Sequence, residues 1–62
     1  MIVTISYGVD NAPETLENVV SIEEIPSYGG NGSGVSIRYI SKNGYSHVRN
    51  IRYTNYVTIT IH

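Results

Sequence analysis

Residues 35–53, VSIRYISKNGYSHVRNIRY, decide the fold of this 62-residue chain. Apolar and polar side chains alternate in two runs, residues 35–41 and 45–53, on either side of Lys42-Asn43-Gly44. Such alternation is typical of a half-buried β-strand, and an Asn-Gly pair between two alternating runs is the strongest short-range signal for a β-hairpin. The stretch therefore predicts a hairpin with a two-residue type I′ turn at Asn43 and Gly44.

The register of this hairpin depends on its turn. A type I′ turn would place Ile37 opposite Asn50, so an apolar side chain would face a polar one on the side that should be buried. One extra residue near Arg49 or Asn50 would correct the mismatch, because a β-bulge shifts the register by one position. Ile37 would then lie opposite Ile51. We predict a β-bulge at this point of the second strand.

The apolar composition favours strands over helices. Nine Ile and seven Val stand against one Leu, one Met and one Ala, and all six aromatic residues are Tyr. β-branched side chains are stiff and pack well on a pleated surface, and Tyr suits half-buried positions where the ring packs and the hydroxyl stays hydrated. The chain has no Cys, so neither a disulfide nor a thiolate metal site can stabilise it.

Three further strands are expected around the hairpin, at residues 1–7, 19–25 and 56–61. Pro26 should end the second of them. Their expected inward-facing side chains are Met1, Val3, Ile5 and Tyr7, then Val20 and Ile22, then Val57, Ile59 and Ile61. The last strand has no charged side chain between residues 57 and 61, so it should be covered by the first strand or by a second copy of the chain.

The connections differ in character. Residues 11–18 have a turn-forming composition that allows at most one helical turn, capped by Asp10 or Asn11. Residues 28–34 are rich in Gly, but a strand follows them where a phosphate-binding loop would lead into a helix. We interpret them as a flexible connection between strands.

These elements predict a single all-β domain with five strands. Residues Thr54-Asn55-Tyr56-Val57, followed by Ile59, resemble the Ser-Asn-Tyr-Val segment that opens the last strand of SH3 domains. The resemblance implies a small antiparallel barrel in which Tyr56 lines a groove for proline-rich peptides. The chain departs from that family at Tyr53, where Pro is usual, and in having no Trp for the groove wall. The alternative is a strongly twisted meander that dimerises through an edge strand.

Charge is divided between the two halves of the sequence. All five acidic residues lie in residues 1–31 and all four basic residues in residues 32–62, for a net charge of −1. The predicted register places the basic side chains together on the outer face of the hairpin, around an apolar and aromatic centre typical of protein interfaces. The candidate interaction site is Arg38, Ile40, Lys42, Tyr45, His47, Arg49 and Arg52.

An internal explanation of the basic surface is also open. If residues 19–25 pair beside residues 35–41, Glu23 lies on the same face as Arg38 and can form an ordinary cross-strand ion pair with it. The charge of the hairpin would then be neutralised within the chain.

Composition and charge together indicate a non-enzymatic protein-protein interaction module, or a small regulator or inhibitor, whose partner has an acidic surface. A weak single-stranded nucleic-acid-binding barrel is the alternative, disfavoured by the negative net charge. We expect no enzymatic activity, no cofactor and no metal site, because the chain offers no spaced ligand set and little room for a walled pocket. Since the acidic loop of one copy can meet the basic hairpin of another, a homodimer or higher homo-oligomer is a further expectation.

The sequence also bears on where the protein is found. No apolar run reaches membrane-spanning length, and the first residues lack the basic and apolar regions of a signal peptide. We therefore expect a cytoplasmic protein without membrane contact. Its size leads us to expect a complete small gene product of the kind that phages or mobile elements encode.

Overall fold

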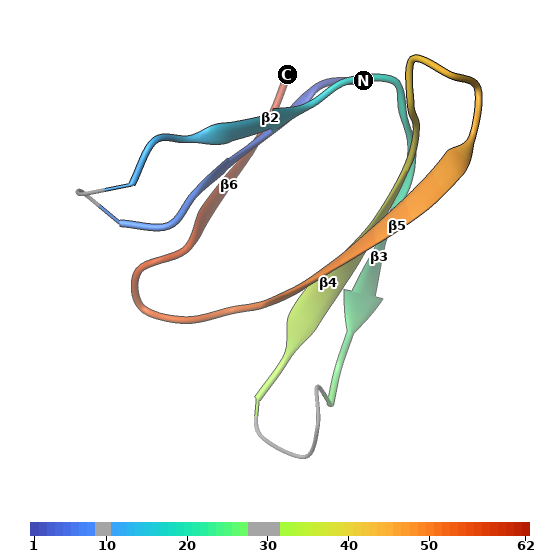
Figure 1. The fold of residues 1–62 in the computed structure, drawn as a ribbon. Coiled ribbons are helices and arrows are strands. Elements are labelled where there is room, and N and C mark those ends of the chain that lie inside the picture. Colours follow the sequence, from blue (N-terminus) through green and yellow to red (C-terminus); the bar gives the residue numbers. More distant parts are fainter. Residues whose placement is uncertain (9–10, 28–31) are drawn as a thin grey trace.

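The protein consists of two three-stranded antiparallel sheets (Figure 1). A computed structural model describes residues 1–8, 11–27 and 32–62, and these contain strands and connections but no helix. Consequently no helix that could cross a membrane is found among them. The six strands are β1 (Val3–Ser6), β2 (Glu14–Leu16), β3 (Val19–Ile25), β4 (Gly34–Ile40), β5 (Ser46–Arg52) and β6 (Thr58–Ile61). The all-β prediction is confirmed, with one strand more than expected.

The first sheet has the order β2-β1-β6. Its central strand β1 is the predicted half-buried strand, in which Val3 and Ile5 are fully buried while Thr4 and Ser6 lie on the other face. Both neighbours pair with β1 in antiparallel register, with Ile5 opposite Glu14 on one side and opposite Ile59 on the other. Strand β1 therefore covers one edge of β6, which was one of the two arrangements expected for the uncharged segment 57–61.

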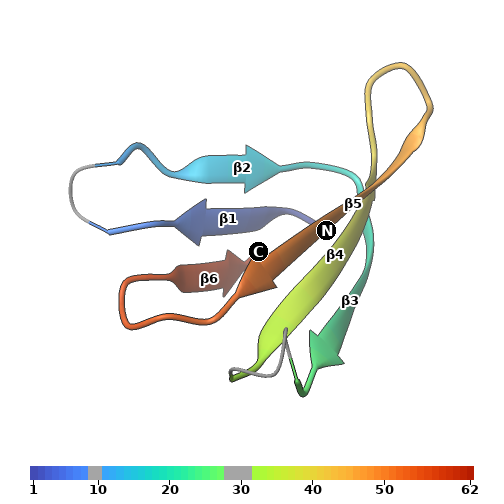
Figure 2. The ribbon, with the colours of Figure 1, turned by 60° about the horizontal axis from the view of Figure 1, so that its bottom comes forward.

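The second sheet has the order β3-β4-β5. The chain passes into it from the first sheet through a short connection between β2 and β3 (Figure 2). Strand β2 ends only a short step before β3, and Asn18 between them adopts a left-handed backbone with φ of 56°. Asn (with Asp) tolerates this conformation better than other non-Gly residues. Two hydrogen bonds fix the step, because Val19 N donates to Met1 O at 3.0 Å and Ile40 N donates to Asn18 O at 3.1 Å. Glu14–Leu16 is therefore a strand where at most a helical turn was expected.

The β4–β5 hairpin is present, but its turn is not the predicted one. Ser41 N donates to Tyr45 O at 2.9 Å and Gly44 N donates to Ser41 O at 2.9 Å, which leaves a three-residue loop, residues 42–44, between the strands. Gly44 has φ of 86°, whereas Asn43 is absent from the described residues with positive φ. A type I′ turn needs positive φ at both residues, so the observed turn is a type I turn followed by a left-handed Gly.

The longer loop changes the register of the hairpin. Ile37 lies opposite Arg49, and Val35 lies opposite Ile51, with no register shift between β4 and β5. The predicted bulge is therefore wrong: the third loop residue shifts the register by one position in the opposite direction, so that Arg49, and not Ile51, lies opposite Ile37. As a consequence, Arg49 shares the inner side of the hairpin with Ile37.

The core lies between the two sheets and is small. It consists of Val3, Ile5, Leu16, Val19, Val35, Ile37 and Ile51, with Tyr7, Ile22, Tyr39, Val57 and Ile59 packed against it. A register shift between Val19 and Ser21 breaks the alternation of β3, so Val19 is buried and Val20 is exposed. The expectation that Val20 shares an inward face with Ile22 was therefore wrong. Ile61, also expected inward, is exposed.

The predicted closed barrel is not found. In the described part of the chain β5 and β6 each lie at the edge of a sheet and do not pair with each other. The cap proposed at Asp10 and residues 28–31 of the glycine-rich connection lie outside the described residues.

Candidate functional site

Arg49 joins the two sheets through a bidentate ion pair. Its guanidinium on β5 lies 2.7 Å (Nη2) from Glu14 Oε1 and donates from Nη1 to Glu14 Oε2 at 2.9 Å, so both carboxylate oxygens of β2 are contacted. Nη2 also donates to the hydroxyl of Tyr7 at 3.3 Å. The three side chains meet because Tyr7 and Glu14 belong to the inner side of the first sheet and Arg49 to the inner side of the second.

The electrostatics of this cluster follow from its contacts. The hydrogen bond that Arg49 donates to Glu14 raises the pKa of Arg49 above its usual range, although partial burial acts in the opposite direction. The Arg49 side chain is 39% exposed and that of Glu14 37% exposed, so water still screens the pair. The cluster joins the two sheets at the rim of the core.

The charge split of the sequence is thus partly resolved within the chain. An acidic residue of the first half binds a basic residue of the second. The observed pair is Glu14 with Arg49, whereas the sequence had suggested Glu23 with Arg38. Strand β3 does pair with β4, and Glu23 shares the outer face with Arg38, but it lies opposite Ser36, two residues from Arg38. No ion pair joins these two described side chains, and both are exposed.

The predicted interaction residues do not share one face. In the observed register Arg38, Ile40 and Arg52 lie on the outer face of the second sheet, whereas His47 and Arg49 lie on the inner side. Lys42 belongs to the turn, and Tyr45 follows it. The single basic surface expected from the bulged register is therefore wrong, because the observed turn exchanges the faces of every β5 residue before the supposed bulge.

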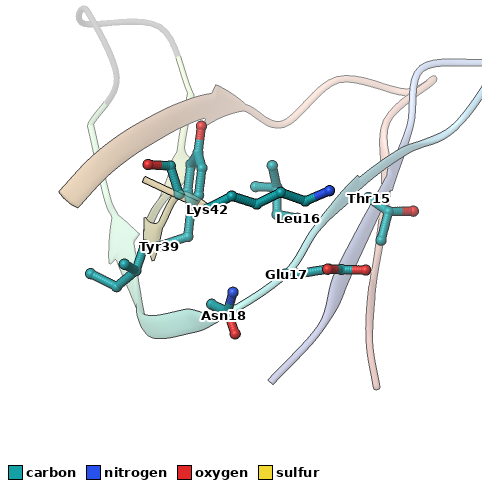
Figure 3. Close-up of a pocket in the computed structure, with 8 residues that line it drawn as sticks. Thr15, Leu16, Glu17, Asn18, Tyr39 and Lys42 are labelled. Carbon is teal, nitrogen blue, oxygen red and sulfur yellow. The ribbon is translucent and has the colours of Figure 1, made fainter. Parts of the chain in front are cut away.

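The inner side of the hairpin carries an aromatic pair near the turn. The rings of Tyr39 and His47 stack with centroids 5.5 Å apart and an angle of 22° between their planes. Beside Tyr39 is an open hollow of about 270 Å³ between the turn and the step from β2 to β3. Figure 3 shows Lys42 extending across this hollow toward Leu16.

A second hollow lies between the sheets where β5 leads toward β6. It measures about 400 Å³, and its lining is more apolar than that of the first. We call it the tyrosine groove; its lining residues are Tyr7, Asn50, Ile51, Arg52, Thr54, Tyr56 and Val57. Tyr56 is 75% exposed although it stands beside this hollow. Two hydrogen bonds order its neighbourhood, from Tyr56 N to Thr54 Oγ1 at 3.3 Å and from Val57 N to Thr54 O at 3.3 Å.

Sequence reasoning found this groove only in part. Tyr56 was singled out by its resemblance to the SH3 segment, and Arg52 by its charge. Tyr7 was expected to face inward, which it does, but its position beside Tyr56 depends on how β1 lies against the β5–β6 connection. That contact joins residues far apart in the sequence and has no local signal.

In comparisons with known proteins, no protein family, no curated protein and no solved structure matches the chain. The described residues also contain no cluster of three or more His, Asp or Glu side chains that could hold a metal ion. Any function must therefore be inferred from the surfaces themselves.

Proposed function

We propose that this chain is a non-enzymatic protein-binding module whose tyrosine groove docks an extended segment of a partner. The observation that carries the proposal is the groove itself, in which the exposed ring of Tyr56 and the half-buried ring of Tyr7 flank an apolar floor that includes Ile51. Tyr rings offer a large rigid contact area with a polar tip, and aromatic residues concentrate at interface hot spots.

The position of β5 supports an extended ligand. Strand β5 is the edge of the second sheet, and its residues 50–52 form one side of the groove. Extended peptides bind at such sites either by adding to a sheet edge or by lying along an aromatic-lined groove. The groove lining includes Ile51 and Val57 beside two Tyr residues, so a segment that carries an apolar side chain has complementary chemistry.

The SH3-like layout is the second part of the proposal. We propose that the two sheets are the halves of an SH3-like barrel whose open side lies between β5 and β6. Three observations support it: β1 pairs with both β2 and β6, the chain passes from β2 to β3 with little interruption, and a short connection leads from β5 to β6. In this arrangement the tyrosine groove lies at one end of the open side, where β5 leads toward β6.

The hairpin surface is the competing docking site within the same function. Arg38 and Val48 lie opposite each other on the outer face and are both exposed, and Tyr45 is 69% exposed at the end of the turn. This surface retains Arg38 and Lys42 of the basic side chains predicted to meet an acidic partner. We favour the groove because Tyr7, Ile51, Tyr56 and Val57 line one hollow of about 400 Å³ there.

Two matched tyrosine variants decide between these sites. Tyr56 and Tyr45 are similarly exposed, so neither Tyr56→Ala nor Tyr45→Ala should unfold the protein. The immobilised wild-type chain captures partners from a lysate of its native host, and each variant is compared by quantitative mass spectrometry. We expect Tyr56→Ala to lose the specific partner at least tenfold and Tyr45→Ala to keep it.

The opposite result would move the site to the hairpin, and equal capture by both variants would contradict docking at either tyrosine. Nuclease treatment tests the nucleic-acid alternative in the same experiment. Capture that disappears with nuclease and falls steeply with salt would replace the protein partner by a nucleic acid.

A further inference from the structure

Four strand edges border the two sheets, and one of them has no charge, Pro or bulge that would prevent edge-to-edge association. Proteins protect exposed edges with short strands, charges, Pro and bulges. Strand β2 is short, follows Pro13 and contains Glu14. Strand β3 has a bulge, two Glu and a following Pro, and β5 carries two Arg. Strand β6, with the sequence TITI, has no charge, no Pro, no Gly and no bulge.

The hydrogen bonds of β6 show which groups its open side presents. His62 N donates to Ile2 O at 2.8 Å, so the backbone N–H and C=O groups of His62 face the β1 side of the strand. Hydrogen-bonding positions alternate along an antiparallel pair, so Thr60 also faces β1, and Ile59 and Ile61 direct their N–H and C=O groups away from it. No strand of the described chain pairs with that side.

Apolar side chains lie beside this edge. Ile61 is 59% exposed although it belongs to the face that buries Val3, its partner on β1. An added strand would cover the exposed part of Ile61 and satisfy the outward backbone groups of Ile59 and Ile61 together.

We propose that β6 is a homodimer interface, in which the β6 strands of two copies of this chain pair antiparallel about a two-fold axis. A second copy is the occupant that fits best because β6 has no charged side chain to select a different partner, and two identical uncharged strands bring no like charges together. The two first sheets would join into one six-stranded sheet with the order β2-β1-β6-β6-β1-β2.

The hydrogen bonds also select one register. The outward groups of Ile59 must pair with those of an outward residue in the other copy, which is Ile59 or Ile61. Pairing Ile59 with Ile59 would engage Val57 at the ends, but Val57 N already donates to Thr54 O. Ile59 of one copy therefore lies opposite Ile61 of the other. The two Thr60 residues, one from each copy, face each other on the two-fold axis and form a non-hydrogen-bonded pair with close side chains.

Single-cysteine variants test both the dimer and its register. The wild-type chain has no Cys, so Thr60→Cys and Thr58→Cys each introduce one thiol, at exposed positions on the same face of β6. Across the axis two residues 60 have Cβ atoms about 5 Å apart, close to disulfide distance. Two residues 58 are about 13 Å apart, because four residues of strand separate them at about 3.3 Å each. We expect mild oxidation to cross-link Thr60→Cys rapidly and Thr58→Cys at least tenfold more slowly.

Sedimentation velocity of the wild type, from micromolar to millimolar concentration, should show a monomer–dimer equilibrium that persists at high salt. Ile61→Pro removes an outward N–H without touching the ladder to β1, so it should abolish the dimer while circular dichroism stays that of a folded chain; Ile61→Val should keep the dimer. Equal cross-linking of the two Cys variants, a wild type that stays monomeric, or a dimer that dissociates in salt would each overturn the proposal. Tyr56→Ala leaves this dimer intact, which separates the outcome from that of the docking site.

Discussion

The ion pair between Glu14 and Arg49 should show measurable coupling in a double-mutant cycle. The variants are Glu14→Gln, Arg49→Met and the double variant. Met keeps much of the apolar stem of Arg49 and removes its charge, and Gln keeps the shape of Glu14. The cycle separates the interaction between the two side chains from the cost of each replacement.

The size of this coupling follows from the geometry. Contacts of 2.7 and 2.9 Å to both carboxylate oxygens favour a value above that of an ordinary surface pair. Exposure of 39% and 37% for the two side chains reduces it through solvent screening, so we expect about 0.5–1 kcal/mol. In a domain of this size 1 kcal/mol corresponds to about 4–8 °C in Tm. Urea unfolding followed by circular dichroism measures each variant, and the coupling should fall in high salt.

Glu23 and Arg38 provide the matched control. They share the outer face of the second sheet without forming an ion pair, so the cycle of Glu23→Gln with Arg38→Met should give coupling close to zero. A clear coupling between Glu23 and Arg38, together with none between Glu14 and Arg49, would refute the three-residue turn and the register that follows from it. The bulged register, in which Arg49 faces outward, would then describe the hairpin better.

Three further predictions concern the turn, the pH dependence and the core. Gly44→Ala should cost about 1–2 kcal/mol, because an L side chain is strained at φ of 86°, whereas Asn43→Ala should cost less; urea unfolding compares them. Partial burial and then the charge of Glu24 raise the pKa of Tyr53 above 10.0, so its contribution to stability is fully present below pH 10.0 and is lost as the pH rises through its folded-state pKa. Tyr53→Phe should therefore remove part of the alkaline loss of stability seen in pH-dependent melting. Ile37→Ala should cost about 2–5 kcal/mol and leave the small domain largely unfolded, while Ile37→Val should cost about 0.5–1.5 kcal/mol and fold cooperatively.

Strand positions could be predicted from the sequence because their signals are local. Val19–Ile25 was predicted with the bounds that the structure has, and the two hairpin strands to within one residue at each end. Alternation of β-branched and polar side chains marks such segments without reference to the rest of the chain. Strand β2 was missed because Glu14–Leu16 is short and follows Pro13, so its strand conformation depends on pairing with β1.

The candidate site could not be predicted to the same extent, because the face on which each β5 side chain lies depends on whether the turn has two or three residues. Asn43-Gly44 is compatible with a two-residue loop and with the last two positions of a three-residue loop, since both place Gly where φ is positive. The two loops differ by one residue, and that difference moves His47 and Arg49 from the outer face to the inner side. No feature of residues 42–44 alone distinguishes the loops; the placement of Val48 and Arg49 does, because Val48 is 54% exposed and Arg49 lies opposite the buried Ile37.

The placement of Arg49 also changes which partner the protein suits. Because Arg49 binds Glu14, one of the four basic side chains is already engaged within a chain of negative net charge. Nucleic-acid binding draws most of its affinity from the number of phosphates neutralised, so each cation lost to an internal pair weakens that function directly. Docking in an aromatic groove depends on apolar area and shape, which the pair does not diminish. The same contact that fastens the two sheets thus favours a protein ligand at the tyrosine groove over a phosphate backbone at the hairpin.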